Sequence, residues 1–159
     1  MQTLTKARRS CFSALALLLL VTMASAERSI DVSGYYVLRE SVASEFPEVR
    51  WLELSEMTSA APFQRVPLFG AIRLRERGPD GIYVSLPLSQ VSLQESALRF
   101  ETAERLGSSL RFAGAFEKIG VVRDIAAPGE VILRGTLDRL RNGKVEKSVD
   151  VAFTFTEGD

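Results

Sequence analysis

The residues best suited to catalysis in this chain are carboxylates. Glu45 and Glu48 lie close together in the sequence, Asp124 and Glu130 form a second group, and Asp138 follows. Two carboxyl groups that share a cleft can divide the acid and base roles of a hydrolytic reaction. The sequence therefore leaves open a carboxylate-based hydrolase, although each of these residues is equally typical of a solvated surface.

Other familiar catalytic chemistries lack their residues. The chain has no His, and its one Cys is Cys11, close to the N-terminus. No imidazole base is therefore present for a Ser or Cys nucleophile, and the usual zinc ligands are missing. Neither of the Gly-rich phosphate loops GxxxxGKS and GxGxxG occurs. We therefore predict a protein that is not an enzyme and that holds no cofactor and no metal.

Three arginines at alternate positions suggest a possible site for an anionic ligand. Arg73, Arg75 and Arg77 project from one face of a predicted strand, and Arg99 or Arg111 could extend this stripe. The plainer interpretation is a soluble sheet face, because exposed ion pairs contribute only about 0 to 1 kcal/mol. Alternating charge also protects a sheet edge from aggregation.

Residues 57–70 form the most informative irregular stretch of the sequence. The stretch contains two prolines, which disfavour regular strand pairing, yet it is more apolar than an ordinary connection. It either plugs one end of the fold or contacts a ligand or partner through Phe63, Arg65 and Phe69. Trp51 either caps the same end or belongs to the core.

Strand-like alternation of apolar and polar residues dominates the rest of the chain. Weaker strands are expected at residues 32–38 and 49–54, and no segment has a convincing helical pattern. The alternation is clearest near the C-terminus, where one face collects Val149, Val151, Phe153 and Phe155.

Three predicted hairpins close through loops that end in glycine. The loops are residues 79–81, 105–107 and 141–143, and each third position would adopt the left-handed conformation: Gly81, Gly107 and Gly143. A register that differed by one residue would turn a buried face toward water. The predicted registers pair Leu74 with Leu86, Phe100 with Phe112, Leu98 with Gly114, and Leu133 with Val151.

Two glycines lie on the inner faces of these hairpins. Gly114 is predicted opposite Leu98, and Gly135 opposite Val149. A glycine inside a strand usually marks a bend or the close approach of another group. Three interpretations follow: corners of a curled sheet, a cavity for a ligand, or space filled by an aromatic side chain from a neighbouring strand.

These hairpins and the early strands together define the expected fold. We predict an all-β domain, an antiparallel up-and-down meander of about eight strands that forms a curled sheet or barrel. The alternative is a two-layer β-sandwich. The order of the hairpins within the sheet rests on the tendency of consecutive elements to lie side by side.

The N-terminal segment has the features of a secretory signal peptide. A basic front precedes an apolar run at residues 12–23 and small residues at 24–26, so cleavage is expected before Glu27. The run is shorter than the roughly 17 to 25 residues that span a bilayer, so no transmembrane anchor is expected. Cys11 precedes the run, which argues against a lipid anchor. The expected domains are a cleaved segment, 1–26, and one β-domain, 27–159.

The expected mature chain is slightly acidic. Cleavage would remove three of the 20 Lys and Arg residues and none of the 20 Asp and Glu residues, which leaves a net charge near −3. A nucleic-acid partner would favour a basic domain, so none is predicted. We expect a periplasmic or extracellular, non-catalytic protein that binds a small hydrophobic or amphipathic ligand or an envelope protein. The alternative is the carboxylate-based hydrolase, acting on envelope glycan.

Overall fold

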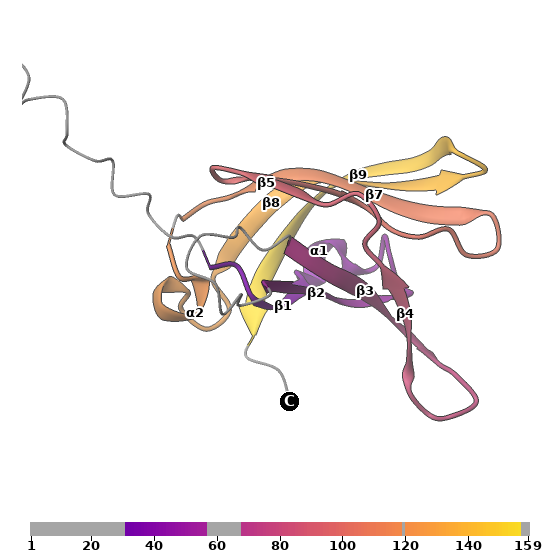
Figure 1. Ribbon diagram of the computed structural model, residues 1–159, viewed down its shortest axis with the longest axis horizontal. Helices are drawn as coiled ribbons and strands as arrows, with labels where there is room; N and C mark the ends of the chain where they lie inside the picture. The colour runs from indigo at the N-terminus through magenta and orange to yellow at the C-terminus, as the bar shows by residue number, and fades with distance from the viewer. Residues whose placement is uncertain (1–30, 57–67, 119, 157–159) are drawn as a thin grey trace, which may run out of the picture.

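The computed structural model describes residues 31–56, 68–118 and 120–156. Two short helices, α1 (Glu40–Ala43) and α2 (Val122–Ile125), accompany nine strands (Figure 1). The strands are β1 (Gly34–Leu38), β2 (Val49–Glu56), β3 (Leu68–Arg77), β4 (Tyr83–Pro87), β5 (Ser92–Gln94), β6 (Ala97–Glu101), β7 (Ser108–Phe116), β8 (Val131–Arg141) and β9 (Lys144–Thr156).

All nine described strands belong to one antiparallel sheet that curls into a half-barrel. Its order is β4-β3-β2-β1-β9-β8-β7-β6-β5, so two meanders, β1 to β4 and β5 to β9, join where the first and last strands pair. Consecutive strands are neighbours throughout both meanders. The all-β meander and curled sheet are therefore confirmed, and the sandwich alternative is wrong because a single sheet wraps around the core.

The two ends of the curled sheet meet at one point. An isolated antiparallel bridge joins Leu88, just after β4, to Thr102, just after β6. Two backbone hydrogen bonds flank it: the Ser89 N–H donates to the Glu101 carbonyl and the Ala103 N–H to the Pro87 carbonyl, each at 2.7 Å. The chain between β4 and β6 thus holds one end of the half-barrel together.

Aromatic side chains fill much of the inner face. Phe100 stacks on Phe112 with ring centroids 5.3 Å apart, and Phe112 meets Phe153 edge to face at 5.7 Å. The Tyr36 ring makes similar edge contacts with Phe116 and Phe155 and is fully buried. Burying side chains of this size stabilises a fold by roughly 1.5 to 3 kcal/mol each, so these rings account for a large part of the core energy.

Both helices are single turns of four residues, which explains why the sequence has no helical periodicity. After α1, the chain inserts Phe46 into the core with no exposed surface. The Arg139 guanidinium and Lys147 ammonium lie 5.4 and 5.5 Å from the Phe46 ring centroid. Within the described residues, no helix is long and apolar enough to cross a bilayer.

The hairpin between β3 and β4 has the predicted three-residue loop, residues 79–81. Gly81 takes a positive φ of 77°, as the loop requires. The predicted pairing of Leu74 with Leu86 is wrong, because an irregularity in β3 shifts the register and Leu86 pairs with Ile72. The shift is by an even number of residues, so the apolar residues still share the inner face.

The other two hairpins have tighter turns than the sequence predicted. Leu106 and Gly107 both have positive φ, 54° and 75°, and Asn142 and Gly143 have 49° and 74°. Positive φ at both central positions is the mark of a two-residue type I′ turn, so the predicted three-residue loops are wrong.

A bulge in β9 restores the apolar register after the second of these turns. Between Arg139 and Leu140 the pairing shifts, and Leu133 then pairs with Phe153 instead of the predicted Val151. Leu133 and Val151 still share the inner face, and both are buried. The predicted face is confirmed, although the exact pairs are wrong. A sequence pattern with a period of two fixes the face of each side chain but not shifts of two residues.

Gly114 and Gly135 lie directly opposite each other in β7 and β8. Each glycine also pairs with the strand on its other side. Gly114 pairs with Leu98 of β6, as predicted, whereas Gly135 pairs with Val151 of β9 and not with Val149. The ring of Phe112 fills the space over both glycines: a Cβ added to either would lie within 2.7 Å of its Cζ. Phe112 belongs to β7, the strand that also contains Gly114, and not to a neighbouring strand. Its ring occupies the space in which a ligand cavity was one of the three predictions.

Candidate interaction surface

Three aromatic side chains form a row on the outer face of the β1 to β4 half. Tyr35 in β1 and Trp51 in β2 each precede a buried residue, and Tyr83 in β4 lies three residues before the buried Leu86, so the three rings point away from the core. The Tyr35 and Trp51 ring centroids are 6.1 Å apart and those of Trp51 and Tyr83 are 5.6 Å apart, both edge to face. Each ring remains half-buried.

Two guanidinium groups stack on this row. Arg50 is the extra residue where the β2–β3 register shifts, and such a bulge re-aims a side chain. Its guanidinium carbon lies 4.6 Å from the Trp51 ring centroid and 4.0 Å from that of Tyr83. The guanidinium carbon of Arg77 lies 4.2 Å from the Tyr83 ring centroid. We call Tyr35, Arg50, Trp51, Arg77 and Tyr83 the aromatic–arginine cluster.

Both guanidinium groups also bind the same phenol oxygen. Arg50 donates a hydrogen bond to the Tyr83 hydroxyl, and Arg77 donates to it at 2.7 Å and to the Gly81 carbonyl at 2.7 Å. Within the described ranges, neither guanidinium forms an ion pair with a carboxylate. Glu53, on the same face, is held by Arg73 at 2.9 Å. The cluster therefore carries a local excess of positive charge.

The sequence singled out Trp51, and the structure places it at the centre of this cluster. It is half-buried and is not one of the buried core residues. The Trp51 indole N–H is hidden from solvent and has no hydrogen-bond partner among the residues that the structure describes. Phe69 lies on the same outer face, opposite Ser55, and 47% of its surface is exposed.

Two of the predicted contact residues, Phe63 and Arg65, lie outside the described residues. Tyr35, Arg50 and Tyr83 were missed by sequence reasoning. The alternation in β1 would have placed Tyr35 outward, but only the bulge brings Arg50 over Trp51. The bulge has no signature in a pattern of apolar and polar residues.

The proposed arginine stripe does not form as a unit. Arg73 is bound to Glu53, Arg77 belongs to the aromatic–arginine cluster, and Arg111 is paired with Asp138 in the other half of the sheet. The sheet order separates β3 from β6 and β7, which carry Arg99 and Arg111.

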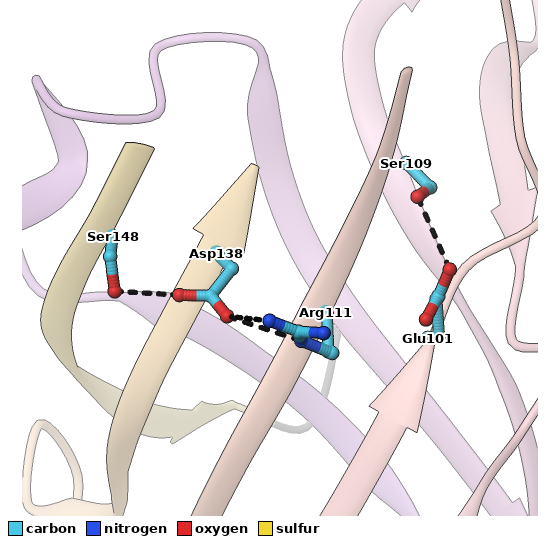
Figure 2. Close-up of polar contacts among 5 residues, drawn as sticks. All are labelled: Glu101, Ser109, Arg111, Asp138 and Ser148. Atoms are coloured by element: carbon cyan, nitrogen blue, oxygen red, sulfur yellow. Dashed lines mark hydrogen bonds and ion pairs between the residues drawn. The ribbon is translucent and has the colours of Figure 1, made fainter. Parts of the chain in front are cut away.

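A different arrangement covers the outer face of the β6 to β9 half. Cross-strand pairing places Glu101, Arg111, Asp138 and Ser148 in one row over these strands. Figure 2 shows Asp138 between its two donors: Arg111 donates at 3.1 and 2.8 Å, and the Ser148 hydroxyl at 2.6 Å. We call these four residues the polar row. The Arg111 and Asp138 charges are paired within the sheet, and Glu101 accepts a hydrogen bond from the Ser109 hydroxyl at 3.4 Å.

Partners within the polar row set the charge state of Asp138. Partial burial alone would raise the pKa of this carboxyl, but the hydrogen bonds from Ser148 and Arg111 and the Arg111 charge lower it below its ordinary value. Asp138 is thus held as a carboxylate, which accepts protons poorly and has none to donate.

Three of the other predicted carboxylates are also held by cations, whereas Asp124 is exposed. Glu45 pairs with Lys147 at 2.7 Å, Glu48 with Arg139, and Glu130 with Lys118 at 2.7 Å. The hydrogen bond from Lys118, followed by one from the Ala127 N–H, lowers the pKa of Glu130. The partners of Glu45 and Glu48, Lys147 and Arg139, are cross-strand neighbours, so these two carboxylates lie near each other, but each is bound to its own cation. No group of three or more acidic, His or Cys residues suited to a metal occurs among the described residues.

An open groove of about 400 Å³ lies between α1 and strands β8 and β9. Its lining includes Arg39, Arg134, Thr136 and Asp150. Arg134 is paired with Glu117, and the Thr136 hydroxyl donates to Asp150 at 2.9 Å. Most of its polar groups already have partners, so the groove offers fewer free donors than the aromatic–arginine cluster.

No family model, curated protein or solved structure matches this chain.

Proposed function

We propose that this chain is an exported, non-catalytic module of the cell envelope that binds an envelope protein. The contact surface is the outer face of the β1 to β4 half. The aromatic–arginine cluster carries this proposal, because Trp, Tyr and Arg are the residue types that dominate the energetics of protein interfaces. Phe69 adds exposed apolar surface on the same face.

Binding of a small hydrophobic ligand inside the barrel has less support. Such a ligand would need space on the inner face, where Phe112 lies over Gly114 and Gly135 and stacks on Phe100. A docking module, in contrast, works with a filled core.

The hydrolase alternative also has less support. Such an enzyme needs two carboxyl groups in one cleft, with the pKa of the general acid raised above that of its partner. Glu48 and Asp138 instead lie in separate ion pairs, as does Glu130. The pKa values of Asp138 and Glu130 are both lowered, whereas a general acid requires a raised one.

Site-specific photocrosslinking in the producing cell tests the docking surface. Replacing Phe69 by p-benzoylphenylalanine keeps an aromatic side chain and places the reactive group on the proposed surface. We expect one protein adduct of discrete mass. Its yield should fall in a Trp51→Phe background and vanish in Trp51→Ala, with folding checked by circular dichroism.

The same crosslinker at Arg99, an exposed position in the other half of the sheet, is the matched control. An adduct of equal yield at Arg99, or one at Phe69 that does not depend on Trp51, would contradict the proposed surface. A small molecule found bound to the purified protein by native mass spectrometry would favour the interior ligand instead.

A further inference from the structure

The charge balance of the aromatic–arginine cluster indicates the chemistry of its partner. Arg50 and Arg77 both donate to the Tyr83 hydroxyl, which brings two positive charges close together. Like charges at such a separation repel each other, and a neutral phenol does not compensate them. Glu53, the carboxylate on this face, is already engaged by Arg73. A negative group supplied from outside would remove the repulsion.

Hydrogen-bond geometry favours a carboxylate as that group. A guanidinium presents several N–H donors in a fixed planar fork, which matches the two oxygens of a carboxylate. Among the described residues, the Arg50 guanidinium donates to the Tyr83 hydroxyl, and the Arg77 guanidinium donates to that hydroxyl and to the Gly81 carbonyl. These contacts hold the two groups in place and leave other N–H groups for a ligand.

The aromatic surfaces favour a protein over a glycan as the source of the carboxylate. Sugars bind to open aromatic faces, but here the guanidinium of Arg50 lies over both Trp51 and Tyr83, and Arg77 also lies over Tyr83. The remaining contacts of Trp51 are edge to face with its aromatic neighbours. Little ring surface is left for a sugar, whereas side chains of a peptide can pack beside the guanidinium groups.

We infer that Arg50 and Arg77 form a carboxylate-binding site for an acidic segment of the partner protein. This inference rests on the proposed function and names the chemistry of its partner. The expected mature chain is itself slightly acidic. An acidic segment would therefore be attracted to this positively charged surface and repelled by the net charge of the rest of the domain.

Fluorescence titration tests the inference directly, because Trp51 is the single Trp of the chain and lies in the site. The probe is a hexaglutamate peptide with blocked ends, added to the whole protein at low ionic strength. We expect a saturable change in Trp51 emission, confirmed by calorimetry, and affinity that weakens as salt is added. Hexaglutamine with the same blocked ends should cause no change.

Charge-removing variants locate the site. Arg77→Gln does not touch the Trp51 ring, and it should weaken hexaglutamate binding about tenfold or more, as should Arg50→Gln. Arg99→Gln removes an exposed arginine from the other half of the sheet and should leave the affinity unchanged. The inference would be overturned if Arg50→Gln, Arg77→Gln and Arg99→Gln bound hexaglutamate with equal affinity. It would also be overturned if the wild-type protein did not bind hexaglutamate.

Two further outcomes separate the possible explanations. If trigalacturonate bound more tightly than hexaglutamate, the partner would be an acidic glycan and not an acidic peptide, and the inference would be overturned. Failure of hexaglutamate while the Phe69 crosslink still depends on Trp51 would remove the carboxylate site and leave the docking surface intact. Failure of both experiments would remove both proposals.

Discussion

The outer faces of the two meanders use their polar residues in opposite ways. On the β6 to β9 half, Arg111, Asp138 and Ser148 satisfy one another directly across three strands. On the β1 to β4 half, Arg50 and Arg77 are stacked on aromatic rings and share a neutral acceptor. The Arg111 and Asp138 charges of the first face pair with each other, whereas Arg50 and Arg77 have no carboxylate partner among the described residues.

The difference supports the proposal that one curled sheet combines a solvated surface with a binding surface. Opposite charges placed directly across strands stabilise a sheet modestly and keep it soluble. Rigid aromatic residues lose little conformational freedom on contact, and guanidinium groups held against them are already oriented. We therefore expect changes to the β6 to β9 half to alter stability, and changes to the aromatic–arginine cluster to alter binding.

Gly135→Ala should have the largest effect, and it should alter stability without altering binding. A Cβ at this position would lie 2.4 Å from the Ala113 carbonyl oxygen and 2.5 Å from the Gly114 Cα, and backbone atoms cannot move aside cheaply. We expect a loss of roughly 3 kcal/mol in the free energy of unfolding, measured by urea denaturation. Hexaglutamate affinity of the folded fraction should not change.

Gly78→Ala is the matched control, because the closest atom to its added Cβ is the carboxylate oxygen of Asp80, on a side chain that can rotate away. It should cost far less than Gly135→Ala. Tolerance of Gly135→Ala together with altered binding would mean that the glycine pair opens a ligand site, and the comparison between the two faces would fail.

Leu106→Asn tests whether the β6 to β9 half is free of binding residues. Leu106 is 86% exposed and holds a φ of 54°, a conformation that costs a branched aliphatic residue roughly 1 kcal/mol. Asn142 occupies the equivalent position in the neighbouring turn, with a φ of 49°. Asn suits this conformation, so the variant should gain about 0.5 to 1 kcal/mol in unfolding free energy.

The reciprocal change, Asn142→Leu, should lose a similar amount of stability. If Leu106→Asn instead abolished the Phe69 crosslink, the strained leucine would be a binding residue. The comparison would then have to include both ends of the sheet.

Much of the fold was predictable because strand alternation and turn residues act locally. The inner face of β9, the face shared by Leu133 and Val151, and the loop at residues 79–81 all follow from the sequence. The predicted pairs of Phe100 with Phe112 and of Leu98 with Gly114 are also confirmed. The pairs of Leu74 and Leu133 are wrong, because turns and strand irregularities add up to a net shift of two residues, which leaves the buried face unchanged. The tight turn at Leu106 was missed since leucine rarely adopts positive φ.

The candidate site was predictable only in part. Trp51 and Phe69 stood out as aromatic residues beside irregular sequence, and they do share a face. Tyr83 joins them only because β4 folds back beside β3, and Arg50 only because of a bulge. Contacts of this kind depend on pairing between segments distant in sequence, for which a single chain provides no local pattern.

Asp138→Asn should have the smallest effect on the free energy of unfolding, and this effect should depend on pH. The pKa of Asp138 lies below its ordinary value of 3.8, so its ionised form stabilises the folded state above that pH, and this contribution is lost as the pH falls through the lowered pKa. Because Arg111 is 46% exposed, we expect the variant to lose only about 0.5 kcal/mol near neutral pH. Urea unfolding of both proteins from pH 7 down to below the ordinary value should show the difference shrinking only at the acidic end. If the difference in unfolding free energy stayed constant with pH, Asp138 would act through packing alone. The charge pairing within the polar row would then not contribute to stability.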